Sequence, residues 1–92
     1  MGKIFAWSEE KDRWLLGKRG VSFQAVVARI EDGGVLSIVP GKGKFRHQKQ
    51  FVLDLHQYVY VVPFIEDNDK IFLKTIIPSR KLTKRYLSGG LG

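Results

Sequence analysis

The sequence predicts a single α+β domain in which two helices near the N-terminus pack on one face of an antiparallel sheet. Apolar positions recur at helical spacing in the first third of the chain and alternate at strand spacing in much of the rest. Helices that arrive together before a run of strands are typical of the α+β class. The length of 92 residues suffices for one domain only.

The first helix is expected directly after a short strand at residues 3–7. Ser8 can accept a hydrogen bond from the first turn of the helix, and acidic residues follow it where the helix dipole favours them. Gly20 can adopt the left-handed conformation that ends a helix. Between these two residues, the apolar spacing predicts that Trp14 and Leu15 face the core.

The second helix is predicted by another cap, Ser22, and by the Asp32-Gly33-Gly34 segment that ends it. Its expected apolar stripe consists of Phe23, Val26, Val27 and Ile30.

Four strands are predicted to follow as an antiparallel meander joined by short turns. Pro63 has no backbone donor, so we expect its strand to bend or stop pairing there. The last of the four is expected to present Ile71, Leu73, Thr75 and Ile77 on one face. The predicted strands span residues 35–39, 50–55, 58–65 and 70–77.

Pro78 is expected in the first turn of a short closing helix over residues 79–87. The sequence therefore predicts one domain over residues 1–88 and a flexible, glycine-rich tail over residues 89–92.

The composition excludes several functional classes. The chain has no cysteine, which rules out disulfides, thiolate zinc sites and a cysteine nucleophile. The N-terminus lacks the pattern of a signal peptide, and the apolar runs are too short to cross a membrane. No phosphate-binding glycine loop or metal-ligand motif occurs. We therefore expect a cytoplasmic protein with neither cofactor nor metal.

The positive charge is concentrated in two segments. The net charge is +7, and residues 41–50 and 70–85 hold ten of the 16 basic residues and no acidic residue. The remainder of the chain is net acidic. If the fold brings these two basic segments together, they form a field suited to a polyanion. The alternative is a solvated surface that keeps the protein soluble.

Aromatic residues stand beside these cations, as in Phe45-Arg46-His47 and Phe72-Leu73-Lys74. Rings that stack on bases and cations that hold phosphates are typical of proteins that bind single-stranded RNA. In the closing helix, Arg80-Lys81 and Lys84-Arg85 recur four residues apart, so their charges repel each other along one stripe. An anionic partner would relieve that repulsion.

Both ends of the chain resemble BrnT-type toxins. The resemblance lies in the segments Phe5-Ala6-Trp7-Ser8-Glu9-Glu10-Lys11, Lys18-Arg19-Gly20-Val21-Ser22-Phe23 and Ile76-Ile77-Pro78-Ser79-Arg80-Lys81, and in Tyr86. Residues 33–56 match the family in pattern only.

The resemblance implies a RelE-like fold and a cytoplasmic ribonuclease toxin of a type II toxin–antitoxin pair. Such a toxin acts on RNA, including ribosome-associated mRNA, without a metal, and it forms a complex with its antitoxin. The RNA 2′-OH attacks its own phosphate, which requires a base, cations for the phosphorane charge and an acid.

Position in the sequence gives candidate roles. Lys11 is a candidate base or phosphate ligand and Arg80 a transition-state cation, whereas His47 is a candidate acid from sequence reasoning alone, without a counterpart in the family motifs. Lys18 and Lys81 complete the catalytic candidates. The RNA-binding candidates are Arg19, Arg46, Lys49, Lys74, Lys84 and Arg85.

The chain departs from the family at Ser8, where the family has Asp, and at Arg19, where it has His. Loss of that histidine removes the proton shuttle best suited to neutral pH. Either His47 or a lysine replaces it, or cleavage is weak or absent. A non-catalytic RNA-binding or protein-interaction module on the same fold therefore stays open. A DNA-binding regulator is the third alternative, although no helix-turn-helix is predicted.

Overall fold

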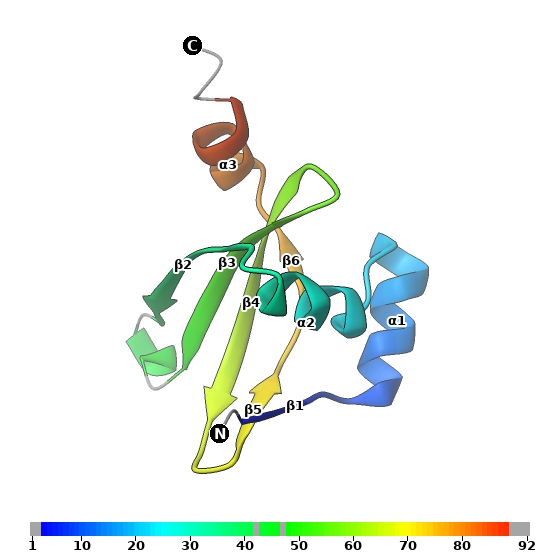
Figure 1. Cartoon of the computed structure of the whole chain (residues 1–92), viewed down its shortest axis with the longest axis vertical. Helices are drawn as coiled ribbons and strands as arrows, with labels where there is room; N and C mark the ends of the chain where they lie inside the picture. Colours follow the sequence, from blue (N-terminus) through cyan, green and yellow to red (C-terminus); the bar gives the residue numbers. More distant parts are fainter. Residues whose placement is uncertain (1–2, 42, 47, 89–92) are drawn as a thin grey trace.

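The computed structural model describes residues 3–41, 43–46 and 48–88 (Figure 1). The predicted tail at residues 89–92 and the candidate acid His47 lie outside this range. The elements are β1 (Ile4–Ala6), α1 (Glu9–Arg19), α2 (Phe23–Glu31), β2 (Val35–Pro40), a 3₁₀ turn (Gly43–Phe45), β3 (Lys49–Leu55), β4 (Tyr58–Glu66), β5 (Lys70–Leu73), β6 (Ile77–Pro78) and α3 (Arg80–Thr83), which a wider helical turn (Lys84–Ser88) continues. This order confirms the α+β class.

The described strands form one sheet in the order β1-β5-β4-β3-β2, and β6 pairs with β4. Strands β2 to β5 are the predicted antiparallel meander, and β1 lies parallel to β5 at one edge. The turn between β3 and β4 consists of His56 and Gln57, both in the left-handed region at φ 54° and 64°. Two such residues match the right-handed twist of a hairpin.

The predicted caps of the two N-terminal helices are present. The hydroxyl of Ser8 accepts from the backbone N–H of Lys11, and that of Ser22 accepts from the N–H of Ala25. Gly20 ends α1 at φ 69° and donates its N–H to the carbonyl of Leu16. These features depend on residues within one helical turn, which is why the sequence alone locates them.

Trp14 corrects the prediction for α1. Leu15 is fully buried, but Trp14 is 46% exposed. The helix touches the core along a stripe too narrow to include both residues. The Trp14 ring instead contacts two cations on its own helix, the ammonium of Lys11 and the guanidinium of Arg19.

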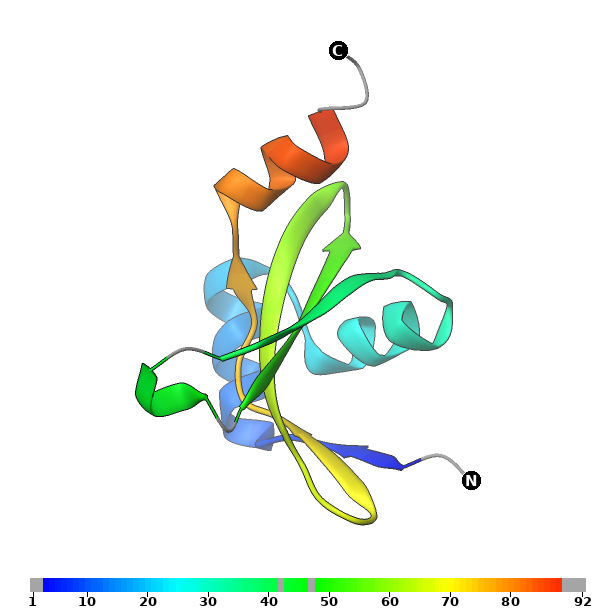
Figure 2. The ribbon, with the colours of Figure 1, turned by 90° about the vertical axis from the view of Figure 1, so that its left-hand side faces the viewer.

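The core lies between α1, α2 and one face of the sheet. In β3 and β4 the residues of this face alternate with those of the other face, as strand geometry requires. Figure 2 shows α2 on one side of the sheet and the 3₁₀ turn on the other. The core contains Leu15, Val21, Phe23, Val26, Phe51, Leu53, Leu55, Val62, Phe64, Leu73 and Ile76.

Strand β4 does not stop pairing at Pro63, contrary to part of the prediction. Pro63 pairs with Gln50 of β3, and its carbonyl accepts from the N–H of Lys74. That carbonyl faces the gap between β5 and β6, and the missing N–H of a proline faces the same side of a strand. On that side the strand paired with β4 changes from β5 to β6. The interruption expected in the strand of Pro63 therefore occurs between β5 and β6, and β4 itself continues.

The predicted strand over residues 70–77 is therefore split into β5 and β6. Leu73 and Ile76 are both fully buried, whereas Ile77 is 41% exposed. The predicted face with Ile77 beside Leu73 is wrong, because the alternation is lost between the two strands.

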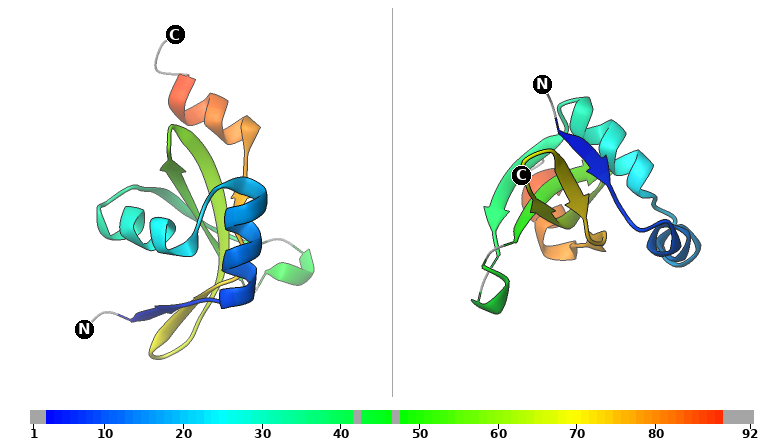
Figure 3. Two further views of the ribbon diagram at one scale, coloured as in Figure 1. Left: turned by 90° about the vertical axis from the view of Figure 1, so that its right-hand side faces the viewer. Right: turned by 90° about the horizontal axis from the view of Figure 1, so that it is seen from below.

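The closing helix begins later than predicted. Pro78 belongs to β6, Ser79 caps the helix, and α3 starts at Arg80. Its place relative to the sheet is visible in both panels of Figure 3. None of the helices described is long and apolar enough to span a membrane.

Candidate nucleic-acid interface

The face of the sheet that α2 leaves uncovered carries a groove of about 800 Å³, which we call the sheet-face groove. Its floor consists of residues that alternate with the core positions of β2, β3 and β4. Its far wall comes from β6, α3 and the final helical turn. The lining residues are Val39, Pro40, Gly41, Gln48, Gln50, Val52, Val61, Pro63, Ile77, Leu82, Arg85 and Tyr86.

The groove joins the two basic segments. Gly41, Gln48 and Gln50 come from residues 41–50, while Ile77 and Arg85 belong to residues 70–85. The N–H of Gly41 donates to the carbonyl of Gln48 at 2.7 Å, which closes the base of the cationic loop at one end of the groove. Residues of both segments therefore line this groove, and Arg85 is the cation that they contribute to its lining among the described residues.

One cross-strand row of the floor is unusual in its chemistry. Gln50 on β3 pairs with Val39 on β2 and with Pro63 on β4, so an amide stands between two apolar residues. The next row, Val52 and Val61, is apolar. Gln48 lies two residues before Gln50 and lines the same groove. Both glutamines are half-buried.

Within the part of the chain that the structure describes, the polar side chains lining the groove make no hydrogen bond or ion pair with other protein groups. Among the described residues, neither Gln48 nor Gln50 makes a side-chain hydrogen bond, and Tyr86 is 41% exposed. Solvent reaches both amides, because the one buried side-chain polar atom without a partner among the described residues is the indole nitrogen of Trp7. The glutamines were not singled out from the sequence. The sequence feature that could have identified them is a pair of glutamines two residues apart, one directly before β3 and one within it.

The groove wall is held by hydrogen bonds between α3 and β4. The N–H of Ser79 donates to the carbonyl of Val59 at 2.9 Å. The hydroxyl of Thr83 accepts from the N–H of Val59 at 2.8 Å and donates to the carbonyl of Ser79 at 2.7 Å. Because Val59 is fully buried, these bonds fix the helix that carries Arg85 and Tyr86.

The C-terminal candidates surround this wall. Arg80 and Lys81 lie on α3 with exposed side chains, and Lys84 and Arg85 lie on the turn that follows. Of these four, Arg85 lines the groove itself. Exposed cations beside a groove suit the neutralisation of phosphates.

The candidates of the central region are placed differently from one another. Arg46 is exposed in the loop that Gly41 and Gln48 close. Lys74 is exposed and adjoins the groove through its backbone bond to Pro63. Lys49 lies on the same face of β3 as the core residue Phe51, opposite the groove, and its ammonium lies 3.6 Å from a carboxylate oxygen of Glu66.

The α1 candidates form a second group around Trp14. The Lys11 ammonium lies 4.8 Å from the centre of the Trp14 ring, and the Arg19 guanidinium lies 5.6 Å from it. Arg19 also donates to the carbonyl of Ile76, directly before Ile77 in the groove wall. Lys18 is exposed. The α1 group is thus linked to the segment before β6, and none of its residues lines the groove.

Two features outside the groove have structural roles. Lys3 donates to Glu66 at 2.8 Å, and this bond, with the charges of Lys3 and Lys49, lowers the pKa of Glu66. Arg29 donates to the carbonyl and the carboxylate of Asp54, which raises the pKa of Arg29.

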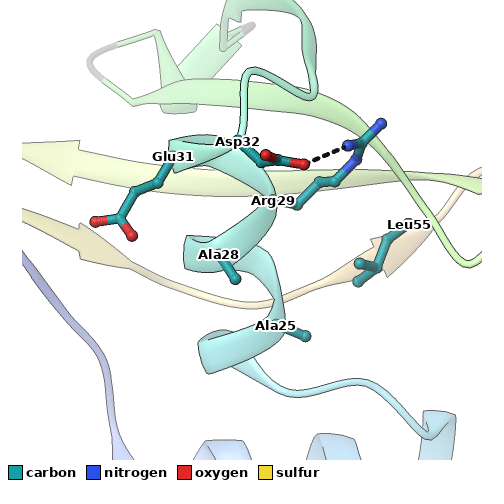
Figure 4. A pocket seen from close by; sticks show the side chains of 6 residues that line it. All are labelled: Ala25, Ala28, Arg29, Glu31, Asp32 and Leu55. Carbon is teal, nitrogen blue, oxygen red and sulfur yellow. Dashed lines mark hydrogen bonds and ion pairs between the residues drawn. The ribbon is translucent and has the colours of Figure 1, made fainter.

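Figure 4 shows the shallow hollow between α2 and β3, where Arg29 points toward Asp32 and Glu31 points away. Because Arg29 is already paired with Asp32 and Asp54, it has little capacity left for a ligand. Among residues 3–41, 43–46 and 48–88, no group of three or more His, Asp or Glu side chains could hold a metal ion.

Comparison with solved structures finds a protein of similar fold. The chain is similar to the crystal structure of YafQ from E. coli, determined for a variant with glutamine in place of a histidine. The TM-score is 0.50 with 12% sequence identity, over 87% of this chain and 97% of that one. No protein-family profile and no curated protein matched the chain. The likeness shows that the chain shares the fold of YafQ, and it does not distinguish a BrnT-like subtype.

Proposed function

We propose that this protein is the toxin of a type II toxin–antitoxin pair and a metal-independent ribonuclease that binds single-stranded RNA along the sheet-face groove. The observation that carries the proposal is the meeting of both basic segments at one uncovered groove. The RelE-like fold and the resemblance to BrnT-type toxins support it. An apolar floor with a few polar groups, a lining arginine (Arg85) and exposed cations nearby suits bases and phosphates together.

In this proposal the cations act on the phosphate. Arg80, Lys81 and Arg85 stabilise the charge that develops when the RNA 2′-OH attacks the adjacent phosphorus, which leaves a 2′,3′-cyclic phosphate. Lys11 and Lys18 bind the RNA strand where it leaves the groove beside α1. The position of Lys11 over the Trp14 ring engages the ammonium as a cation, which fits a phosphate ligand better than a base.

The antitoxin in this proposal is an acidic segment that covers the groove. The net charge of +7 and the clustering of cations favour such a partner. RNA and antitoxin would then compete for one surface, and the toxin would be active only when the antitoxin is removed.

A non-catalytic RNA-binding module is the second candidate, and Arg19 favours it. The family histidine at this position is replaced by a guanidinium that donates to Ile76 and contacts Trp14. An arginine so engaged does not exchange protons at neutral pH. A module that binds RNA without cleaving it accounts for the same groove and charge.

Expression of the protein alone in bacteria tests the toxin proposal. We expect growth to arrest, and the variants Arg80→Ala and Arg85→Ala to relieve the arrest. Arg13→Ala is the matched control, because Arg13 is exposed on α1 and makes no polar contact among the described residues. Normal growth at high expression of folded protein contradicts the toxin function.

Purified protein separates the two candidates. Incubation with RNA in the presence of EDTA should yield fragments that end in 2′,3′-cyclic phosphate, detected by mass spectrometry. RNA that stays intact although it is bound supports the non-catalytic module. Preferential binding of duplex DNA over single-stranded RNA contradicts both candidates and supports the third, a DNA-binding regulator.

A further inference from the structure

Strand β2 (Val35–Pro40) forms one edge of the sheet, and none of the described strands pairs with its outer side (Figure 1). It carries no charged residue. Edge strands of soluble proteins are usually short or charged, because an open row of backbone groups invites pairing with another chain. The opposite edge follows this rule, since β1 has three residues and Lys3 directly before it forms an ion pair with Glu66. The β2 edge is the exception.

The outward backbone groups of β2 can be identified from its pairing with β3. The N–H of Gly41 donates to the carbonyl of Gln48, and hydrogen-bonded pairs alternate with open pairs along an antiparallel ladder. Val39 therefore turns its backbone groups toward β3, whereas Ile38 and Pro40 turn theirs to the outer side. A proline is tolerated on an edge strand when its missing N–H faces outward. The N–H and carbonyl of Ile38 can thus pair with a further strand.

The side chains of this edge are apolar and exposed. Ile38 pairs with the core residue Phe51, yet its own side chain is 54% exposed. Leu36, at the irregularity between Val35 and Ser37, is 38% exposed. A strand added to β2 would cover apolar area and gain hydrogen bonds at the same time.

We propose that β2 pairs with β2 of a second copy of this chain, antiparallel and about a two-fold axis at Ile38. In this register the N–H of Ile38 donates to the carbonyl of Ile38 in the second copy, and symmetry supplies the reverse bond. The two Ile38 side chains lie on the same face of the joined sheet and cover each other. Pro40 of one copy faces Leu36 of the other, so its missing N–H leaves one bond unmade at each end.

The charges at the two ends of β2 suit this partner. Glu31 and Asp32 precede the strand, Lys44 and Arg46 follow it, and all four side chains are exposed. Asp32 and Lys44 each stand six residues from Ile38. The proposed register therefore brings the acidic end of one copy to the basic end of the other, and does so twice by symmetry.

A strand from an acidic antitoxin fits this edge less well. It would be attracted at the basic end of β2 and repelled at the acidic end. Arg29 does not reverse the sign of the acidic end, because it pairs with Asp32 and Asp54. A second copy complements both ends at once.

The two-fold axis of such a pair is perpendicular to the sheet, so both copies present the same face on the same side. Both sheet-face grooves then open on one face, and the residues that line each groove next to the axis are Val39, Pro40 and Gly41. The pairing itself does not depend on what the grooves bind, so it stands or falls separately from the proposed function.

Sedimentation equilibrium of the full chain tests the pairing. We expect the average mass to rise from one chain toward two, with a dissociation constant on the order of 10–100 µM, since one strand pair is smaller than a standard interface. The net charge of +7 opposes association. The measurement is therefore made at about 0.15 M salt, where the screening length is about 8 Å. A mass that stays at one chain up to about 1 mM overturns the inference.

The variant Ile38→Lys should weaken the dimer at least about ten-fold, because two ammonium groups would face each other at the axis in place of apolar side chains. Ile4→Lys is the matched control, since Ile4 is 71% exposed on β1 at the opposite edge. A thermal melt of each variant checks its folding. Equal weakening by both substitutions contradicts pairing through β2.

A single cysteine tests the register. The chain has no cysteine, so in Ile38→Cys a disulfide between copies can form only at that residue. Directly opposed residues of a hydrogen-bonded pair have Cα atoms about 5.5 Å apart, which a disulfide can span. Ile38→Cys should cross-link under mild oxidation, and Ile4→Cys should not. Cross-linking of both at equal rates, or of neither, overturns the proposed pairing.

Hydrogen exchange distinguishes a second copy from a foreign strand. Protection of the Ile38 amide should rise with protein concentration, because pairing supplies its acceptor. Protection that is independent of concentration but induced by a peptide of alternating valine and glutamate would assign the edge to an acidic strand and overturn the self-pairing.

Discussion

The guanidinium of Arg19, the last residue of α1, donates a hydrogen bond to the backbone carbonyl of Ile76 between β5 and β6. This bond joins residues 57 positions apart in sequence. It gives the Ile76 carbonyl a hydrogen-bond donor at the point where the strand predicted over residues 70–77 is interrupted. Arg19, which stands where BrnT-type toxins have histidine, thus has a structural role in this chain.

Replacement of Arg19 by alanine should lower the free energy of unfolding by about 1 kcal/mol, the usual net value of one hydrogen bond. The loss of the cation from the Trp14 ring adds to the effect. Urea denaturation followed by circular dichroism measures it. The same substitution at Arg13 on the same helix should have almost no effect. Equal destabilisation by the two substitutions would contradict the structural role of Arg19.

Thr83 should be required both for stability and for RNA binding. Thr83→Val removes the hydroxyl and leaves the N–H of Val59 without its acceptor. Val59 is fully buried, so we expect a loss of about 1–3 kcal/mol in unfolding free energy. Since α3 carries the groove wall, affinity for single-stranded RNA should fall as well.

The control for Thr83 is Thr75→Val, a similar half-buried threonine that makes no hydrogen bond among the described residues. Hydrogen exchange at the Val59 amide gives a direct measure, because its protection should fall in Thr83→Val and persist in Thr75→Val. Unchanged protection in Thr83→Val would show that the helix is held by other contacts.

Sequence reasoning succeeded where structure depends on neighbouring residues. Ser8, Gly20 and Ser22 act within one helical turn, so their roles follow from residue type and spacing. Trp14 was wrongly expected in the core, because the periodicity of a helix gives the centre of its apolar stripe but not the width that the sheet covers.

The errors in the C-terminal half have non-local causes. At the break between β5 and β6, the N–H of Lys74 donates to the carbonyl of Pro63 on β4, and the carbonyl of Ile76 accepts from Arg19 on α1. Both partners lie outside residues 70–77, so the pattern of that segment alone could not predict the break. The candidate site was predicted in part. Two basic segments could be recognised from charge alone, whereas the exposure of Gln50 depends on which face of the sheet stays uncovered.

The ion pairs of Glu66 predict a pH dependence of stability. Its pKa is lowered from the ordinary value of 4.5, first by the hydrogen bond from Lys3 and then by the charges of Lys3 and Lys49. A carboxylate with a lowered folded-state pKa stabilises the fold above its unfolded pKa, and this contribution is lost as the pH falls through the folded value. Glu66→Gln should therefore destabilise the protein at pH 7 and match the original protein in strongly acidic solution.

Urea titrations across the pH range from neutral to below the ordinary value of 4.5 would measure this difference. Glu31→Gln is the control, because Glu31 is exposed at the end of α2 and its carboxylate points away from Arg29 (Figure 4). Its effect should be small and nearly independent of pH. A Glu66→Gln effect that stays constant into strongly acidic solution would contradict the ionic origin.

The salt dependence of RNA binding should distinguish cations that contact phosphate from cations that are merely exposed. For single strands, the logarithm of the binding constant falls with the logarithm of salt concentration by about 0.7 for each phosphate neutralised. If Arg80 and Lys81 each bind one phosphate, their joint replacement by alanine should reduce the slope by about 1.4. Arg13→Ala should leave the slope unchanged, and Lys18→Ala tests whether the strand extends to α1. Titrations of one oligouridine at several salt concentrations suffice. A slope unaffected by the double replacement would assign phosphate binding to other residues and leave α3 only the role of holding the groove wall.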